Sequence, residues 1–175
     1  MNATPAGAVA LSPQLRLREL HEGDAAFALE LLNDADFLRH IGDKGVRTLA
    51  DAVAYLRNGP LASYAAHGFG LWGVEPREGG ALLGMCGLLQ RDWLDAPDIG
   101  YAFLPAARGR GIAREAAAAT LALARSRFGA ARVLAIVNPD NAASIRLLEG
   151  VGFVADGTAE PPGEGRTIAR YAWTA

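Results

Sequence analysis

The segment LPAARGRGIAREA, residues 104–116, constrains this chain more than any other. It sets two glycines and two arginines directly before an alanine-rich run that continues to Phe128, and alanine is the strongest helix former. The first backbone N–H groups of such a helix have no partner within the helix and, with the helix dipole, favour a negative charge. Because Arg108 and Arg110 add positive charge at the same point, residues 108–113 predict an anion-binding loop.

The flanking sequence places this loop between two strands. PDIGYAFL, residues 97–104, alternates Ile99, Tyr101 and Phe103 with smaller side chains, as a strand does. RVLAIV, residues 132–137, is a nearly continuous apolar run of the kind found where both faces of a strand are covered. The two glycines of the loop remove side chains where a large anion would approach. A strand, loop, helix and strand in this order predict a pyrophosphate cradle.

Other phosphate-binding loops do not fit the sequence. A dinucleotide fingerprint needs a glycine where Arg114 stands, counted from Gly109. A Walker loop ends in Gly-Lys-Ser or Gly-Lys-Thr, and the only lysine of the chain is Lys44.

The rest of the sequence predicts one domain of short strands and helices. Residues 1–13 are expected to form a frayed tail, and residues 14–175 a single domain. In chain order the expected elements are a strand at 14–20, a helix at 25–32 ended by Asn33 and Asp34, a helix begun by Thr48 and ended near Pro60, a hairpin of strands at 67–75 and 79–90, a helix begun by Asn141, and strands at 153–157 and 167–175 joined by a hairpin loop.

Composition excludes several classes of protein. The formal net charge of -2 argues against stable nucleic-acid binding, which needs an excess of basic residues. The single cysteine, Cys86, and three scattered histidines show no metal-ligand spacing, so no metal is expected. The opening residues do not resemble a signal peptide, and the longest apolar run, 116–124, is far short of the roughly 20 residues that span a bilayer. These features predict a cytoplasmic protein that does not bind membranes.

The chain resembles the GNAT superfamily of N-acetyltransferases, in the branch of the ribosomal-protein N-terminal (alanine/serine) acetyltransferases. RGRGIA, residues 108–113, matches the Arg/Gln-x-x-Gly-x-Gly/Ala acyl-CoA signature at every fixed position. DIGYAFLP before it, REAAAATLALA after it and AIVNPDNAASIRLLEGVGF downstream follow the order and spacing of this branch. The resemblance covers residues 15–157.

The resemblance implies a fold and a cosubstrate. The fold is α+β, a layered α/β/α domain whose mixed, mostly antiparallel central sheet splays between two parallel strands and is flanked by helices. The cosubstrate is acetyl-CoA. The residues implied to bind it are the strand-end backbone of Phe103 and Leu104, the loop of Arg108, Gly109, Arg110, Gly111, Ile112 and Ala113, and the side chains of Asn138 and Asn141.

The implied reaction is the transfer of an acetyl group to a primary amine by direct attack, which needs no covalent enzyme intermediate. By the same resemblance, the Ser144 hydroxyl lies near the thioester sulfur, where it would donate a hydrogen bond to the departing thiolate. Candidate general bases are Asp98 and Tyr101 on the strand and Glu75 or His67 on the hairpin, and a chain of water molecules is an equal alternative. Asp98 also reads as a solvated edge carboxylate, and Tyr101, Trp72 and Cys86 also read as core residues.

The acceptor stays open at this stage. It is either a protein N-terminal α-amine or a small amine such as an antibiotic, a polyamine or an amino acid. A further alternative is a non-catalytic acyl-CoA-binding sensor, and a contact of the arginine-glycine tract with RNA is disfavoured by the net charge. The apolar final strand at 167–175 either pairs with a partner in a homodimer or closes its own sheet.

Overall fold

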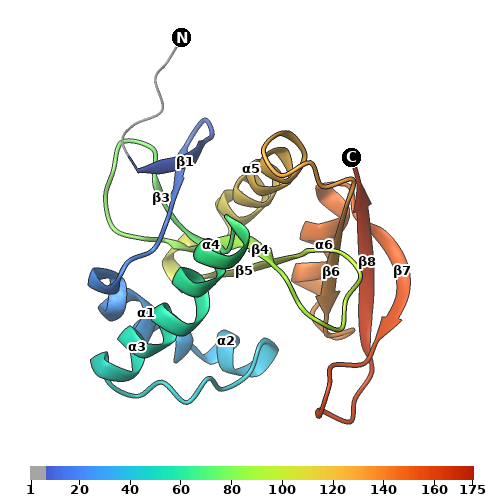
Figure 1. Ribbon diagram of the computed structural model, residues 1–175, viewed down its shortest axis with the longest axis horizontal. Helices are drawn as coiled ribbons and strands as arrows, with labels where there is room; N and C mark the ends of the chain where they lie inside the picture. Colours follow the sequence, from blue (N-terminus) through green and yellow to red (C-terminus); the bar gives the residue numbers. More distant parts are fainter. Residues whose placement is uncertain (1–6) are drawn as a thin grey trace.

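The computed structural model describes residues 7–175, whose strands form one eight-stranded sheet in the order β1-β2-β3-β4-β5-β6-β8-β7 (Figure 1). The strands are β1 (Ala8–Leu11), β2 (Leu15–Arg18), β3 (Leu71–Pro76), β4 (Gly84–Leu89), β5 (Asp98–Phe103), β6 (Arg132–Val137), β7 (Val154–Ala159) and β8 (Ile168–Thr174). The α-helices are α1 (Ala25–Leu32), α2 (Ala35–His40), α3 (Leu49–Leu56), α4 (Ala62–His67), α5 (Ile112–Ser126) and α6 (Ala142–Gly150). Two single turns of 3-10 helix, η1 (Glu22–Asp24) and η3 (Pro105–Ala107), precede α1 and α5, and η2 (Arg57–Leu61) is a π-helical turn.

The sheet is mixed, and it opens between its two parallel strands. β1 to β5 are antiparallel neighbours in sequence order, whereas β5 and β6 are parallel and pair only at Asp98 and Leu134. One backbone hydrogen bond, from Leu134 N–H to the Pro97 carbonyl at 2.8 Å, closes this end. Beyond it the two strands diverge. The expected α+β fold with a splayed sheet is confirmed.

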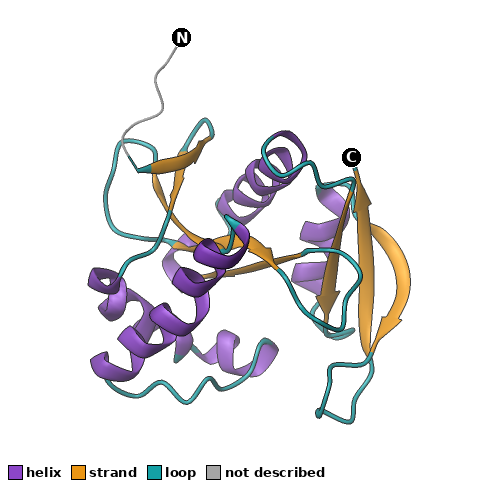
Figure 2. Cartoon of the chain, in the orientation of Figure 1, coloured by secondary structure: helices purple, strands orange, loops and turns teal. Residues whose placement is uncertain are grey.

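Two groups of helices cover the sheet (Figure 2). On one face, residues of α5 and α6 such as Ala116 and Leu148 pack with Trp72 and Ile99 of the strands in the main core cluster. On the other face, α1 and α3 pack against a second cluster that includes Met85 of β4. A cleft between the diverging strands is therefore accessible to groups from both layers.

The N-terminal segment departs from the expected tail. Ala8–Leu11 forms strand β1 and pairs antiparallel with β2, so the prediction of a frayed segment reaching residue 13 is wrong for these residues. Residues 1–6 lie outside the described part of the chain. Glu115 on the first turn of α5 anchors the turn after β1: it accepts hydrogen bonds from the Ser12 hydroxyl at 2.6 Å and the Gln14 amide at 2.7 Å. The apolar alternation of the segment is too short to reveal this pairing.

The region between residues 33 and 67 holds more helix than the sequence predicted. Asp34 does end the preceding segment, but its carboxylate also accepts hydrogen bonds from the amides of Asp36 and Phe37 and so begins α2. Thr48 begins α3 with a reciprocal capping box, as expected. The expected stop at Pro60 is wrong, because the π-helical turn accommodates the proline and the helix continues to His67, where Gly68 ends it with a left-handed φ of 76°.

The final strand is an internal strand of its own sheet. β8 pairs antiparallel with β6 on one side and with β7 on the other, which leaves β7 at the edge. The expectation that residues 167–175 close the chain's own sheet is therefore confirmed. The PPGEGR segment connects β7 to β8 as a hairpin loop, as expected.

Candidate active site

A cleft with a volume of about 1090 Å³ opens where β5 and β6 separate. Its walls come from β5, β6, α2, the start of α5, the first turns of α6 and the loop between β7 and β8. The cleft therefore contains most residues that the sequence singled out: Asp98, Tyr101, Phe103, Arg108, Gly109, Gly111, Ile112, Ala113, Asn138, Asn141 and Ser144.

The loop before α5 has the properties of an anion cradle. Gly109 and Gly111 adopt left-handed backbone conformations, with φ of 71° and 74°. A Cβ atom at either position would meet nothing within 4 Å, so backbone conformation, rather than clearance, requires glycine here. Within residues 7–175, no hydrogen bond uses the backbone N–H groups of 109–114. Such a set of free donors at a helix N-terminus fits a pyrophosphate group.

The two arginines of the loop have different surroundings. The Arg108 guanidinium donates to the carboxylates of Asp34 and Asp36, each at 2.6 Å, and to the Phe103 carbonyl at 2.9 Å. Despite the opposing effect of burial, the hydrogen bond from Arg108 helps to hold the pKa of Asp34 below its usual value. Among the described residues, no hydrogen bond or ion pair involves the exposed Arg110 side chain. The loop therefore offers Arg110 as its uncommitted positive charge.

The strand end beside the loop also differs from its expected role in part. The Leu104 amide donates to the Leu83 carbonyl at 2.9 Å, so it faces β4 and does not offer its N–H to the cleft. Alternate residues of a strand direct their backbone groups to opposite neighbours, so Tyr101 and Phe103 direct theirs toward β6. The backbone of Phe103 can therefore make the expected contact with acetyl-CoA, and its carbonyl also accepts a hydrogen bond from Arg108. The Leu104 N–H is unavailable for such a contact.

A hydroxyl pair connects β5 to α6. The Tyr101 and Ser144 hydroxyls are hydrogen-bonded to each other, and burial raises the pKa of Tyr101 to about 12. Ser144 lies in the first turn of α6, where the Asn141 side chain accepts a hydrogen bond from its amide at 3.2 Å. Tyr101 stays protonated at neutral pH, so the pair cannot act as a base near pH 7. Because one O–H is used between the two hydroxyls, the other is left to donate a hydrogen bond to a bound molecule.

Asn138 connects three parts of the cleft wall. Its amide nitrogen donates to the His40 carbonyl at 2.9 Å, and its side-chain oxygen accepts from Arg166 at 2.5 Å. The resemblance implies that this side chain binds acetyl-CoA, and in the structure both of its polar atoms also have protein partners. Asn138 therefore joins the end of β6 to the end of α2 and to the β7–β8 loop.

Asp98 lies at the closed end of the splay and is only 1% exposed. Both of its carboxylate oxygens accept hydrogen bonds from Arg91 Nε at 3.1 Å. Burial raises the pKa of Asp98 to about 6, although the Arg91 charge opposes this rise. The interpretation of Asp98 as a solvated edge carboxylate is therefore wrong, and a buried carboxylate with a pKa near 6 has the properties of a general base.

Asp98 and Tyr101 lie on opposite faces of β5. Tyr101 packs with the α5 and α6 side of the sheet, where Ser144 lies. A Cβ atom on Gly100 would meet Leu71 and Leu89 on the other face, and Asp98, two residues earlier, shares that face. The slot between the strands is thus flanked by a hydroxyl pair on one face and a carboxylate on the other.

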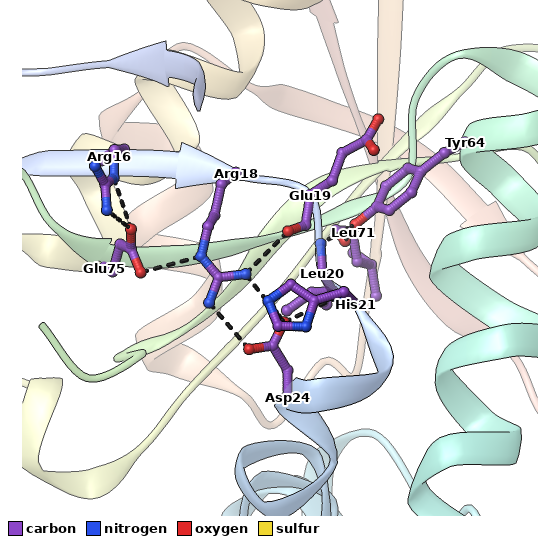
Figure 3. A network of polar contacts seen from close by, with 9 residues as sticks. All are labelled: Arg16, Arg18, Glu19, Leu20, His21, Asp24, Tyr64, Leu71 and Glu75. Carbon is purple, nitrogen blue, oxygen red and sulfur yellow. Dashed lines mark hydrogen bonds and ion pairs between the residues drawn. The ribbon is translucent and has the colours of Figure 1, made fainter. Parts of the chain in front are cut away.

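The alternative candidates lie outside the cleft: Glu75 is on β3, and His67, expected on a strand, is the last residue of α4. Glu75 is 3% exposed and is bound by Arg16 and Arg18, in the network that Figure 3 shows. Arg18 also pairs with Asp24 at 3.0 Å, so the network fixes the entry to α1 (Figure 3). His67 stacks on Phe69 at a centroid distance of 5.6 Å. Neither Glu75 nor His67 lines the cleft, so neither is available as its base.

Trp72 and Cys86 are core residues, as their strand positions suggested. The Trp72 ring is 1% exposed and stacks with Phe128 at 6.2 Å. Cys86 is fully buried beside Thr120, and burial raises the pKa of its thiol to about 12. A protonated, buried thiol is a poor nucleophile, which agrees with direct attack by the amine.

Several cleft residues were not found by sequence reasoning. Arg91 and Trp93 follow β4 in a segment that carries no recognisable motif, Asp34 and Arg166 lie in connecting segments, and Asp36 lies in the first turn of α2. The partners of Asp34, Asp36 and Arg166 include residues 28 to 74 positions away, and no local pattern identifies such pairs.

Comparison with known proteins agrees with this geometry. A family model described as "Acetyltransferase (GNAT) domain" matches residues 14–154, so the chain belongs to the GNAT family of acetyltransferases. Two relatives from Bacillus subtilis (strain 168) each align over 147 residues and 82% of this chain. The uncharacterized protein YkkB is 32% identical, with 83% of its length covered, and the uncharacterized N-acetyltransferase YoaA is 27% identical, with 81% covered.

Solved structures share the whole fold. The ribosomal alpha-N-protein acetyltransferase RimL, in complex with coenzyme A, superposes with a TM-score of 0.81 at 18% identity, covering 95% of this chain and 97% of that one. Mycobacterium smegmatis RimJ, in complex with a CoA-disulfide, gives 0.77 at 24%, covering 95% and 87%. A GNAT-family acetyltransferase from Bacillus anthracis gives 0.78 at 24%, covering 94% and 97%. At these identities the likeness establishes the fold.

The expected family and enzyme class are thus confirmed: the protein is an acetyltransferase of the GNAT family, whose members use acetyl-CoA. The presence of RimL and RimJ among the structural neighbours accords with the expected branch. In residues 7–175, no helix is long and apolar enough to cross a membrane, and no group of three or more His, Cys, Asp or Glu side chains is placed to hold a metal ion.

Proposed function

We propose that the enzyme transfers the acetyl group of acetyl-CoA to a single primary amine with uncharged surroundings, and that a peptide N-terminus is its acceptor class. Charge pairing in the cleft carries this proposal. The carboxylates that line the cleft are Asp34, Asp36, Asp98 and Glu164. All of them are paired with an arginine: Arg108 takes the first two, Arg91 takes Asp98 and Arg166 takes Glu164.

This pairing disfavours polycationic acceptors. An aminoglycoside or a polyamine carries several ammonium groups, each of which needs a carboxylate that is not already neutralised. The cleft also contains Lys44 and Arg114, so its lining cations outnumber its carboxylates by five to four, counting Lys44, Arg91, Arg108, Arg114 and Arg166. A peptide N-terminus brings one amine on an otherwise neutral backbone and avoids this repulsion.

The apolar part of the cleft supports the same class. On the face that Asp98 shares, the lining includes Phe37, Tyr55, Leu71, Met85 and Trp93. Such a wall suits the side chain and backbone of a terminal residue, whereas it offers nothing to a row of charged groups.

In this proposal different residues of the cleft act as the base, as the hydrogen-bond donor and as the phosphate-binding groups. Asp98 accepts the proton of the attacking amine, because its carboxylate is ionised above a pKa of about 6. From the opposite face, the Ser144 hydroxyl, oriented by Tyr101, donates a hydrogen bond to the departing thiolate. The amides of residues 109–113 and the Arg110 charge hold the pyrophosphate, and Asn141 fixes the first turn of α6 around Ser144.

The test is thiol release from acetyl-CoA, with mass spectrometry of the products, across four acceptor classes: short peptides with a free N-terminus, amino acids, polyamines and aminoglycosides. We expect acetylation of the peptide α-amine, and no product from the same peptide with a blocked N-terminus. Acetylation of polyamines or aminoglycosides in preference to peptides would contradict the proposed class. Coenzyme A binding without any product across the panel would favour a non-catalytic acyl-CoA sensor.

A further inference from the structure

Helix α2 is held at both ends by side chains that follow the two diverging strands. At its N-terminus, Arg108, which follows β5, donates to Asp34 and Asp36 at 2.6 Å each. At its C-terminus, Asn138, which follows β6, donates to the His40 carbonyl at 2.9 Å. The helix thus spans the open end of the gap between β5 and β6, and it is hydrogen-bonded to one residue that follows each strand.

The hydrogen bonds that Arg108 donates to Asp34 and Asp36 compete with binding of a phosphate by the same side chain. Its guanidinium faces two carboxylates and a carbonyl, and one of those carboxylates, Asp34, is also the cap that begins α2. A phosphate drawn to this guanidinium would meet two negative charges at hydrogen-bond distance of the same atoms. Arg110, two residues later, is exposed and has no such partners among the described residues.

The side chain of Asn138 is likewise occupied by hydrogen bonds to other parts of the protein. Its donor goes to α2, and its acceptor holds Arg166 of the β7–β8 loop at 2.5 Å. Arg166 pairs in turn with Glu164 at 2.6 Å. The end of β6 is therefore the junction of the two segments that border the cleft mouth.

Helix α2 carries part of the acceptor-side wall. Phe37, only 5% exposed, packs in the second core cluster and lines the cleft together with His40 and Ile41. The helix has only six residues, which is too short for stability on its own. Its position consequently depends on the groups that hold its ends.

We propose that Arg108 and Asn138 are positioning residues that strap α2 across the open end of the slot and so set the binding of the acceptor, and that neither is a ligand of acetyl-CoA. The inference rests on the proposed function only for the choice of the peptide acceptor. Arg110 and the loop amides then provide the phosphate contacts, and the two arginines of the RGRG motif have separate tasks.

The experiment compares Arg108→Gln and Asn138→Ala with the matched control Arg110→Gln. Calorimetry with coenzyme A alone gives the Kd, and steady-state thiol release gives the acceptor KM and kcat. For Arg108→Gln and Asn138→Ala we expect the acceptor KM to rise about tenfold with the Kd of coenzyme A within about twofold of wild type, as for loss of a hydrogen bond to a charged or buried group. For Arg110→Gln we expect the reverse, a Kd about tenfold higher and an unchanged acceptor KM.

A double variant keeps the test independent of the loop. Asp34→Asn combined with Asp36→Asn removes the two negative charges that pair with Arg108, and asparagine retains the ability to cap α2. If Arg108 is a strap, this variant reproduces the acceptor defect of Arg108→Gln. If Arg108 binds phosphate, it leaves the acceptor KM unchanged and coenzyme A binding equal or tighter. That result, or a tenfold weaker binding of coenzyme A to Arg108→Gln, would overturn the inference.

Failure of the proposed function is distinguished by hydrogen exchange, which needs no acceptor. In the presence of coenzyme A, the amides of residues 35–40 should exchange faster in Arg108→Gln and Asn138→Ala than in wild type or Arg110→Gln. Faster exchange without any acetylated peptide would show the strap to be real and the acceptor class to be wrong. Unchanged exchange in both variants would contradict the strap itself.

Discussion

The two sides of the cleft present different polar groups, backbone N–H groups on one side and paired charged side chains on the other. On the cradle side, residues 109–114 present backbone N–H groups that no acceptor within residues 7–175 uses. On the acceptor side, around α2 and the closed end of the splay, the charged side chains are already paired. In the proposed function, a continuous turn binds the cosubstrate, whereas pairs of side chains shape the wall that meets the acceptor. Substitutions on the two sides should therefore separate the binding of coenzyme A from the use of the acceptor.

The largest effect is expected at Asp98. Asp98→Asn removes the proposed general base and should lower kcat/KM by about 10²- to 10⁴-fold while leaving the Kd of coenzyme A nearly unchanged. In wild type, activity should fall as the pH drops through about 6, because a protonated carboxyl cannot accept the amine proton. A pH profile of thiol release checks both points. An acid limb that persists near pH 6 in Asp98→Asn would assign it to another group.

A smaller effect is expected from the hydroxyl pair. Ser144→Ala removes the proposed donor to the departing thiolate and should lower kcat about tenfold to hundredfold. Tyr101→Phe, which leaves the serine in place without its partner, should have a milder effect of the same kind. Calorimetry should find coenzyme A binding unaltered in both. A Ser144→Ala variant with wild-type kcat would remove this residue from the reaction.

The cradle side should respond in binding alone. Gly111→Ala forces a Cβ atom into a left-handed conformation, which costs about 1–2 kcal/mol, and should raise the Kd of coenzyme A about tenfold with the acceptor KM unchanged. Gly68→Ala is the matched control, because Gly68 has a similar φ of 76° at the end of α4, outside the cleft. An equal loss of coenzyme A binding in both variants would mean that the effect is one of general stability.

The smallest effect on activity is expected from the network around Glu75. Glu75→Gln leaves Arg16 and Arg18 facing a neutral group and should reduce the free energy of unfolding by about 3 kcal/mol, as for other broken buried pairs. Its kcat/KM per folded molecule should stay at the wild-type value. Thermal unfolding and thiol release, measured on the same sample, check this. A loss of activity without a loss of stability would place this network in the active site after all.

The contrast between the two sides also explains what the sequence could predict. The cradle, the Thr48 cap and the Asn141 cap depend on neighbours within a few residues, so their patterns are visible in the chain itself. Interactions such as Arg108 with Asp34, or Asn138 with His40, join segments about 70 to 100 residues apart, and no local pattern reports them. For the same reason the sequence predicts Arg108 as a phosphate ligand and gives no sign of its pairing with α2.

Single residues with two roles account for the main errors in the fold. Asp34 predicts the end of one helix, and the sequence does not reveal α2, because aspartate is equally suited to begin the next helix. Pro60 predicts a stop, because a proline normally disrupts the α-helical hydrogen bonds, and the π-helical turn removes that conflict. Ala8–Leu11 offered too few residues to distinguish a strand from a tail.

The proposed acceptor class is tested most directly by a competition between two acceptors in one tube. The enzyme is given acetyl-CoA with equal concentrations of a neutral peptide with a free N-terminus and a polyamine, and the acetylated products are quantified by mass spectrometry. Because every lining carboxylate of the cleft is already paired, we expect at least about a tenfold excess of acetylated peptide, the discrimination expected from unpaired or repelled charges. An excess of acetylated polyamine would contradict the proposed acceptor class.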